Sequence, residues 1–260
     1  MPITTSGDRG ANPGASPAGV KGLFVDEIVR ALQEFDVDLA VHSAKDLPSE
    51  DPEGIVVAAV PERASPYDVL VTRESKIGDG AVVGTSSLRR RGQLRAARPQ
   101  FEIHDIRGNV DTRLRKLEEG EVDGLVLAAA GLARLGIQPP HVEPLTADVM
   151  LPAPGQGAIA IQTRAEVADL FTMLDHAPSA VAFDAERKLT SLLGGGCALP
   201  LGAFATVHGQ TITLRARVFT PDGSSLVHAE ASSIWVDEVA GVVAERLRSR
   251  GAERILADLT

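Results

Sequence analysis

Apolar residues follow two kinds of spacing along the chain, and the two kinds alternate over its first half. Phe24, Ile28, Ala31 and Phe35 recur every three or four positions, which predicts a helix with one buried face. Short unbroken apolar runs predict buried strands. The expected helices are 23–35, 87–98, 110–119 and 128–135, and the expected strands are 39–41, 55–60, 81–83, 101–106 and 124–127. Such alternation is typical of parallel sheets joined by crossover helices.

A change of pattern after residue 196 indicates a separate C-terminal part. Beyond a helix expected at 180–193, three strand-like segments follow one another and a long helix comes last, which is typical of an α+β domain. The expected strands are 201–207, 211–219 and 226–232, and the last helix is 236–248. Segments rich in proline or glycine at 61–66, 151–157 and 175–178 are the expected hinges. We therefore expect two α/β lobes facing a shared cleft, and a third domain.

Length and composition agree with several domains. A chain of 260 residues exceeds the usual single core. Its hydrophobic fraction of 44% and charged fraction of 23% are those of an ordinary soluble protein rather than a disordered one. The predicted divisions are 1–61 plus 157–174 for domain 1, 66–151 for domain 2 and 177–260 for domain 3.

Charge and cysteine content exclude several classes of protein. The net charge of -9 argues against a general nucleic-acid binder, so any anion site must be local. One cysteine cannot form an intramolecular disulfide, and residues 1–5 lack the basic and apolar regions of a signal peptide. No apolar run approaches the ~20 residues of a membrane span. We expect a cytoplasmic protein, a monomer, with neither a membrane nor a nucleic acid as partner.

The single cysteine, Cys197, follows three consecutive glycines. Structural cysteines are mostly buried, whereas reactive ones are partly exposed near groups that favour the thiolate. A bare glycine loop therefore favours covalent chemistry at this sulfur. The alternative is that the glycines only end the preceding helix, since glycine commonly adopts the left-handed conformation that closes one.

Several arginines lie at the expected start of a helix, where a positive charge is unfavourable. Arg89, Arg90 and Arg91 follow Gly84-Thr85-Ser86-Ser87-Leu88 at an expected strand-to-helix turn, where free backbone N–H groups and hydroxyls can bind an anion. A cation in a first helical turn opposes the helix dipole by roughly 0.3–1 kcal/mol. These arginines need a negative partner, either an internal carboxylate or a ligand. Successive helical residues diverge by about 100°, so we expect Arg89 and Arg90 to share it.

The same arrangement recurs at Arg107 and Arg113, around a helix that Asn109 is expected to cap. Two such clusters favour a ligand with several carboxylates, because guanidinium groups hold carboxylates with paired hydrogen bonds. The alternative for each single arginine is a solvated or salt-bridged surface position.

A third candidate follows the strand at 39–41. Ligands of open α/β sheets bind beyond the carboxyl ends of strands, which is where Lys45 and Asp46 stand. An ionised carboxylate in an arginine-rich cleft can stabilise a cationic intermediate or relay a proton. The alternative is a salt bridge in a turn before Pro48. His42 lies within the strand and is expected in the core, and no spacing of histidine, cysteine and acidic residues suggests a metal site.

Six motifs stand in the order and spacing of one enzyme family, and they span essentially the whole chain. They are Lys21-Gly22-Leu23-Phe24, His42-Ser43-x-Lys45-Asp46-x-Pro48, Gly84-Thr85-Ser86-Ser87-Leu88-Arg89-Arg90, Arg107-Gly108-Asn109, Leu151-Pro152-Ala153-x-Gly155-Gln156-Gly157 and Gly195-Gly196-Cys197. On these motifs the chain resembles the porphobilinogen deaminases, also called hydroxymethylbilane synthases.

This resemblance implies a transferase of haem biosynthesis. It would join four porphobilinogen molecules head to tail, release one ammonia from each, and yield linear hydroxymethylbilane by hydrolysis. The resemblance implies that Cys197 carries a dipyrromethane cofactor through a thioether, and that Asp46 is the catalytic carboxylate. It also implies two doubly wound lobes like those of periplasmic binding proteins plus a C-terminal α+β domain. The implied cofactor contacts are Lys45, Thr85, Ser87, Arg89, Arg90, Arg107 and Arg113, and the implied substrate contacts are Lys21, Phe24, Arg107 and Arg113.

The start of the chain departs from the family. Members normally begin with a strand and helix carrying a Gly-Thr-Arg-x-Ser-x-Leu-Ala motif, and this chain starts after it, so we expect an N-terminally incomplete domain 1. Two alternatives to the active transferase are a catalytically impaired fragment and a non-catalytic two-lobe protein that binds small anions. A third is a cysteine hydrolase using His42 or His176, although no recognisable spacing links either histidine to Cys197.

Overall fold

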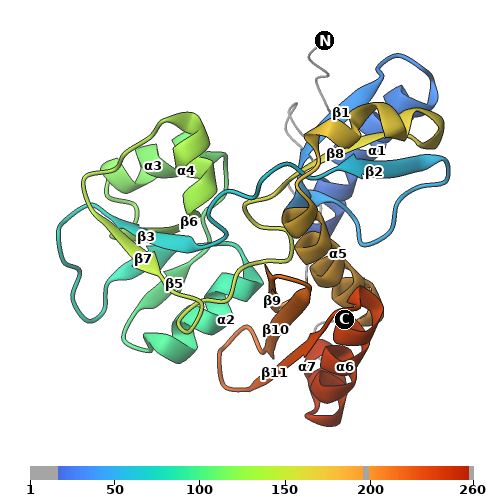
Figure 1. Ribbon diagram of the computed structural model, residues 1–260. Helices are drawn as coiled ribbons and strands as arrows, with labels where there is room; N and C mark the ends of the chain where they lie inside the picture. Colours follow the sequence, from blue (N-terminus) through green and yellow to red (C-terminus); the bar gives the residue numbers. More distant parts are fainter. Residues whose placement is uncertain (1–16, 196–198, 258–260) are drawn as a thin grey trace.

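The computed structural model describes residues 17–195 and 199–257, with the backbone alone for 17–24. Three parts, each with its own sheet, make up the described chain (Figure 1). We call them lobe 1, lobe 2 and the C-terminal unit. Lobe 1 holds α1 (Pro17–Gln33), β1 (Leu39–Ser43), the 3-10 helix η1 (Ala44–Asp46), β2 (Ile55–Ala59), β8 (Ile159–Arg164) and the 3-10 helix η2 (Ala165–Leu174).

Lobe 1 is a three-stranded sheet of order β1-β8-β2 with α1 packed on it. Val29 and Leu32 of α1 lie in one buried cluster with Ala40 and Ala160 of the sheet, as the spacing of apolar residues predicts. β8 is antiparallel to both neighbours. The expectation of parallel pairing is wrong here, because β8 is supplied by chain returning from lobe 2 and not by a crossover helix.

Lobe 2 is a mixed sheet of order β5-β4-β6-β3-β7. Its elements are β3 (Asp68–Thr72), β4 (Val82–Gly84), α2 (Leu88–Ala97), β5 (Glu102–His104), α3 (Val110–Glu118), β6 (Gly124–Ala128), α4 (Ala129–Leu135) and β7 (Val142–Leu145). β4 is parallel to β5 and β6, as predicted for strands joined by helices, whereas β3 is antiparallel to β6 and β7. Asn109 caps α3 by accepting a hydrogen bond from Thr112 N at 2.9 Å, which confirms the cap read from the sequence.

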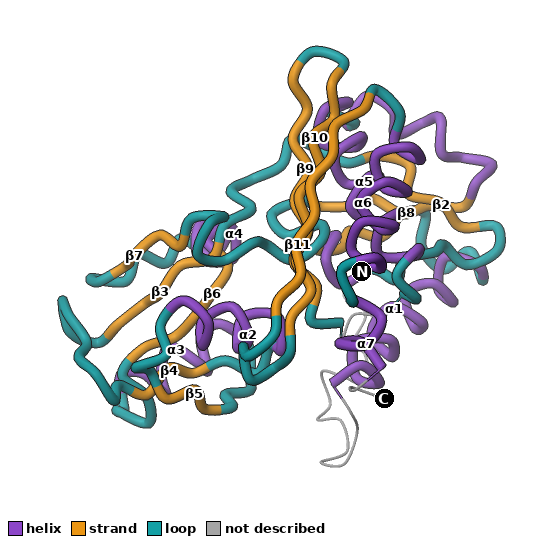
Figure 2. The backbone as a smooth tube through the Cα atoms, turned by 90° about the horizontal axis from the view of Figure 1, so that it is seen from below, coloured by secondary structure: helices purple, strands orange, loops and turns teal. Residues whose placement is uncertain are grey.

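The C-terminal unit has the predicted succession of strands followed by a helix. It contains α5 (Ala177–Leu192), β9 (Leu201–His208), β10 (Thr211–Phe219), β11 (Leu226–Ser233), α6 (Val236–Ser249) and α7 (Ala252–Ala257). The three strands pair antiparallel in the order β11-β10-β9. Figure 2 shows α5 and α6 on one side of this sheet and lobe 2 on the other.

The C-terminal unit contacts both lobes. The hairpin between β10 and β11 lies against α2, where a Cβ on Gly92 would come within 2.7 Å of Thr220 O and a Cβ on Gly223 within 2.8 Å of Gly92 O. These close approaches leave room only for glycine, and they fix α2 against the sheet of the C-terminal unit.

None of the helices within the described ranges is long and apolar enough to cross a membrane.

Candidate active site

The turn after β1 carries Lys45 and Asp46. β1 runs directly into η1, and both side chains are half-buried there. Gly155, from the second expected hinge, rests on this turn with φ +70°. A Cβ at that position would come within 2.9 Å of Ala44 C and Lys45 N. Glycine is therefore required at 155, and the hinge supports the backbone that presents Asp46.

His42 is a buried residue of β1, which confirms the core position read from the sequence. Burial lowers the pKa of its imidazole, and the charge of Asp46 opposes that shift. His42 is therefore neutral near pH 7. Asp46 lies close enough to His42 for its negative charge to affect the pKa of the imidazole. The second candidate histidine, His176, is engaged elsewhere, since its Nδ1 lies 2.8 Å from Ser179 Oγ.

Arg89 and Arg90 share one buried carboxylate, that of Asp68 at the start of β3. Arg89 Nη2 lies 2.8 Å from Asp68 Oδ2, and Arg90 donates to Asp68 Oδ1 from Nε (3.0 Å) and Nη2 (2.8 Å). Burial on its own would raise the pKa of Asp68, but the charges of Arg89 and Arg90 outweigh it and hold this pKa below its usual value. The negative partner expected from the sequence is thus available within the chain, as the internal carboxylate of Asp68.

Gln156 connects this ion-pair cluster to the second hinge. Its amide donates from Nε2 to Asp68 Oδ1 (3.0 Å) and to Pro66 O (2.7 Å), and its Oε1 accepts from Arg89 Nη2 (3.3 Å). Arg89 also donates from Nη1 to Leu151 O at 2.7 Å. Arg89 therefore bonds directly to the second hinge and is linked to the first hinge through Gln156.

The hydroxyls of the strand-to-helix turn shape its backbone. Ser87 is the N-cap of α2, with Oγ accepting from Arg90 N at 3.4 Å. Thr85, which is fully buried, accepts from Ser87 N at 3.2 Å. Ser86 donates to Ile106 O at 3.1 Å. These bonds hold the first turn of α2 beside Ile106, in the loop that follows β5.

Arg107 and Arg113 differ from the first arginine pair, because neither forms an ion pair with a carboxylate within the described ranges. Arg113 is half-buried and donates from Nε to Gly108 O at 2.8 Å, and Arg107 is exposed. Burial lowers the pKa of Arg113, and the charge of Arg90 adds to that shift, although a guanidinium stays charged. The two sequence clusters are therefore close in space, and Arg107 and Arg113 hold positive charge that the described carboxylates do not neutralise.

The end of α5 leads toward the single cysteine. Gly194 and Gly195 both have left-handed backbones, with φ +99° and +55°. Gly195 N donates to Thr190 O at 3.0 Å, which confirms that glycines close this helix. Cys197 lies outside the described residues, and so do the side chains of Lys21 and Phe24.

Two important polar residues, Arg63 and Glu186, are missed by the sequence analysis. Arg63 donates to Glu186 Oε1 (2.7 Å) and Oε2 (3.1 Å), and the buried Glu186 also accepts from Gly155 N (2.6 Å) and Ala205 N (2.7 Å). One carboxylate thereby joins the first hinge, the second hinge and β9. The available signal was a charge at a position of α5 where the helical pattern calls for an apolar residue. Asp68 was missed with β3, the strand that it begins.

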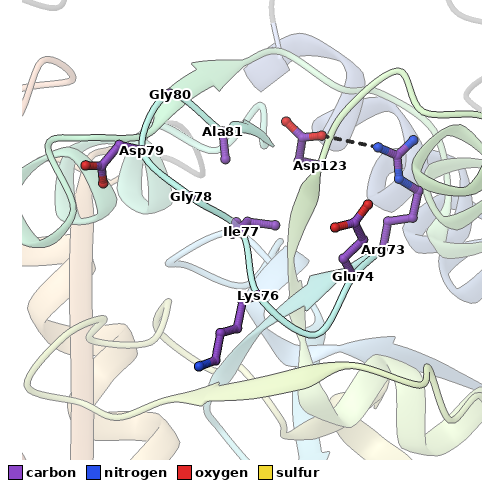
Figure 3. A pocket seen from close by; sticks show the side chains of 9 residues that line it. All are labelled: Arg73, Glu74, Lys76, Ile77, Gly78, Asp79, Gly80, Ala81 and Asp123. Atoms are coloured by element: carbon purple, nitrogen blue, oxygen red, sulfur yellow. Dashed lines mark ion pairs between the residues drawn. The ribbon is translucent and has the colours of Figure 1, made fainter.

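The pocket drawn in Figure 3 lies elsewhere in lobe 2. It has a volume of about 300 Å³, and two of the residues that line it, Arg73 and Asp123, form an ion pair at 3.5 Å. Ala81, which lines this pocket, precedes β4, whereas Thr85 follows the same strand. The pocket is therefore at the opposite end of β4 from the predicted site. None of the predicted site residues with described side chains lines it.

Comparisons with known proteins cover nearly the whole chain. Residues 1–172 match the family domain described as "Porphobilinogen deaminase, dipyromethane cofactor binding domain", and residues 180–247 match its C-terminal domain. A porphobilinogen deaminase from Brevibacillus brevis is 44% identical, over 99% of this chain and 86% of that protein. One from Syntrophotalea carbinolica is 46% identical, over 100% of this chain and 85% of that protein. Among solved structures, the periplasmic aliphatic sulphonate binding protein SsuA from Escherichia coli matches with a TM-score of 0.36 at 17% identity, covering 64% of this chain and 56% of that one.

Proposed function

The chain belongs to the porphobilinogen deaminase family, and we propose that Asp46, Cys197 and the arginines of lobe 2 carry out its reaction. That reaction joins four porphobilinogen molecules into linear hydroxymethylbilane with release of ammonia, a step of tetrapyrrole biosynthesis. The observation that carries the residue assignment is the contact made by two adjacent hinge residues. Gly155 touches the turn of Asp46, and Gln156 bonds to Arg89 and Asp68.

The unneutralised arginines support binding of the substrate's carboxylates. Porphobilinogen carries one acetate and one propionate side chain, and guanidinium groups hold such groups with paired hydrogen bonds. We assign direct contacts to Arg107 and Arg113, assisted by Lys45. Arg89 and Arg90, with two positive charges against the one negative charge of Asp68, leave one net positive charge beneath the site. Thr85 and Ser87 hold the turn that presents them.

Asp46 is assigned the chemistry of deamination. When the protonated amino group of porphobilinogen's aminomethyl arm leaves as ammonia, the carbon–nitrogen bond breaks, the methylene carbon stays on the ring, and the pyrrole nitrogen takes on positive charge. An ionised carboxylate near that nitrogen stabilises the cation and accepts a hydrogen bond from it. The half-buried position of Asp46 supports this role, since partial exclusion of water strengthens the interaction. Lys21 and Phe24, which belong to α1 of the same lobe, are proposed to contact the substrate as well.

Cys197 is proposed to carry the dipyrromethane cofactor, which when bound supplies the free pyrrole position on which the product grows. The residues present suit such a group. Arg107 and Arg113 have no carboxylate partner in the described part of the chain, and the cofactor, like the substrate, carries carboxylates on each ring. The left-handed Gly194 and Gly195 give the loop that leads to the cysteine a sharp turn away from α5. We further propose a cytoplasmic monomer that acts on free porphobilinogen.

Asp46→Asn tests the assignment, because it removes the charge and keeps the size of the side chain. We expect kcat for ammonia release to fall by about 10²-fold or more, and KM to change by less than about threefold, since other residues bind the carboxylates. The matched control is Asp111→Asn, an exposed carboxylate of α3, which should leave both constants unchanged. Wild-type turnover by Asp46→Asn would refute the role of Asp46.

A further inference from the structure

A second contact joins the segments that carry the two proposed reactive residues. It lies between α5, which leads to Cys197, and the loop 47–51, which directly follows Asp46. Arg187 of α5 donates from Nη1 to Asp51 Oδ2 and from Nη2 to Asp51 Oδ1, both at 2.8 Å, and from Nε to Pro48 O at 3.0 Å. All three donor nitrogens of one guanidinium thus bond to this loop.

The contact is partly shielded and is supported on both sides. The side chains of Arg187 and Asp51 are 15% and 23% exposed. Gln162 of β8 donates from Nε2 to Asp51 Oδ1 at 2.8 Å, so lobe 1 holds the carboxylate in place. Such a two-pronged, shielded pair fixes orientation better than an exposed ion pair, which costs side-chain entropy and is screened by salt.

Two further approaches bring the same segments together nearer the cysteine. Ser191 donates from Oγ to Glu50 Oε1 at 3.2 Å. A Cβ on Gly195 would come within 2.7 Å of Ser49 Oγ. The contacts therefore continue from the middle of α5 to the glycines that precede Cys197.

We infer that the Arg187–Asp51 pair, which we call the clamp, sets the position of the end of α5 and of Gly195, which lead to Cys197, relative to the turn of Asp46. Arg187 is then a positioning residue for the deaminase reaction. Arg187 would affect how the growing product is placed relative to the Asp46 carboxylate, and not the affinity for the substrate. This inference rests on the proposed roles of Asp46 and Cys197. Misplacement of reacting groups by about 1 Å can cost about 10²-fold in rate, so one clamp can control turnover.

The test is a double-mutant cycle in the full chain with Arg187→Gln, Asp51→Asn and the double variant. Ammonia release is measured at saturating porphobilinogen, well below each melting temperature. We expect kcat to fall by about tenfold or more in Arg187→Gln, with KM within about twofold of wild type. The double variant should be no slower than the slower single variant, because both changes break the same pair.

The matched control is Lys188→Gln, at the next position of α5. Lys188 pairs with Asp237 of α6 (2.9 Å), inside the C-terminal unit, and its removal should leave kcat unchanged. The reciprocal exchange Arg187→Asp with Asp51→Arg should recover part of the lost kcat, which loss of stability alone would not explain. If Arg187→Gln does not fold, Asp51→Asn still breaks the clamp while leaving Arg187 its bond to Pro48.

The outcomes separate the clamp from the proposed function. Wild-type kcat in Asp51→Asn and in Arg187→Gln, together with an active wild-type chain, would overturn the clamp and leave the proposed function standing. Additive losses in the double variant would overturn it too. Absence of turnover in wild type and in Lys188→Gln would overturn the proposed function and the clamp with it.

Discussion

Removing the carboxylate of Asp68 should destabilise the protein strongly. Asp68→Asn would leave Arg89 and Arg90, which are 4% and 7% exposed, without the one carboxylate that pairs with them among the described residues. Breaking a buried ion pair on one side costs about 3–5 kcal/mol, because the remaining charge is uncompensated. Whole domains are stable by about 5–15 kcal/mol, so a large part of the free energy of unfolding is at stake.

The same carboxylate gives this loss a pH dependence. The pKa of Asp68 is lower in the folded protein than in the unfolded chain, where it is near its ordinary value of 3.8. Its contribution is therefore complete above pH 3.8 and is lost as pH falls through the folded-state pKa. Wild type and Asp68→Asn should differ fully at pH 7, and their stabilities should converge only in acid below pH 3.8.

Urea unfolding at pH 7 measures the effect. The control is Glu119→Gln, which removes an exposed pair between Arg115 and Glu119 in the same lobe and should cost less than about 0.5 kcal/mol. A loss below about 1 kcal/mol for Asp68→Asn would refute the reasoning. So would a difference between Asp68→Asn and wild type that persisted undiminished below the folded-state pKa.

Three further predictions follow from single contacts. Gly155→Ala should lower the free energy of unfolding by about 1–3 kcal/mol and reduce kcat, because φ there is +70° and the added Cβ would meet the backbone of Ala44. Unchanged urea unfolding of this variant would contradict the prediction. Asn109→Ala should cost about 1 kcal/mol in urea unfolding through loss of the α3 cap, and a cost near zero would argue against that cap. Hydrogen bonds from Thr220 and Ser224 lower the pKa of Asp222 to about 2. Thr220→Val should therefore raise the pKa of Asp222 in an NMR titration, and an unchanged pKa would exclude Thr220 as a cause.

Local patterns in the sequence predicted most helices and the glycines that end them. The cap at Asn109, the stop of α2 before Pro99 and the helix-closing glycines after α5 each depend on residues within a few positions of one another. β3 and β8 were missed, although both are buried strands. The antiparallel pairing of β8 depends on where the chain returns after lobe 2, which no local spacing encodes.

The residues that pair with the site residues could not be predicted from the sequence. Arginines at a helix start indicated that a negative partner was needed, but Asp68 stands 22 residues from Arg90 and meets it only through the folding of lobe 2. Glu186 and Arg63 are 123 residues apart. One member of such a long-range pair can be sought as a charged residue at a position where the pattern calls for an apolar one, as with Glu186. Its partner could not be named without the fold.

We propose that Cys197 carries a dipyrromethane cofactor, which stays on the protein while hydroxymethylbilane is assembled on it from porphobilinogen. Intact mass spectrometry of the purified chain beside Cys197→Ala tests it most directly. The account predicts added mass corresponding to two pyrrole units in the wild-type chain and none in Cys197→Ala. A wild-type chain that converts porphobilinogen while its mass equals that of the bare sequence would contradict it, as would the same adduct on Cys197→Ala.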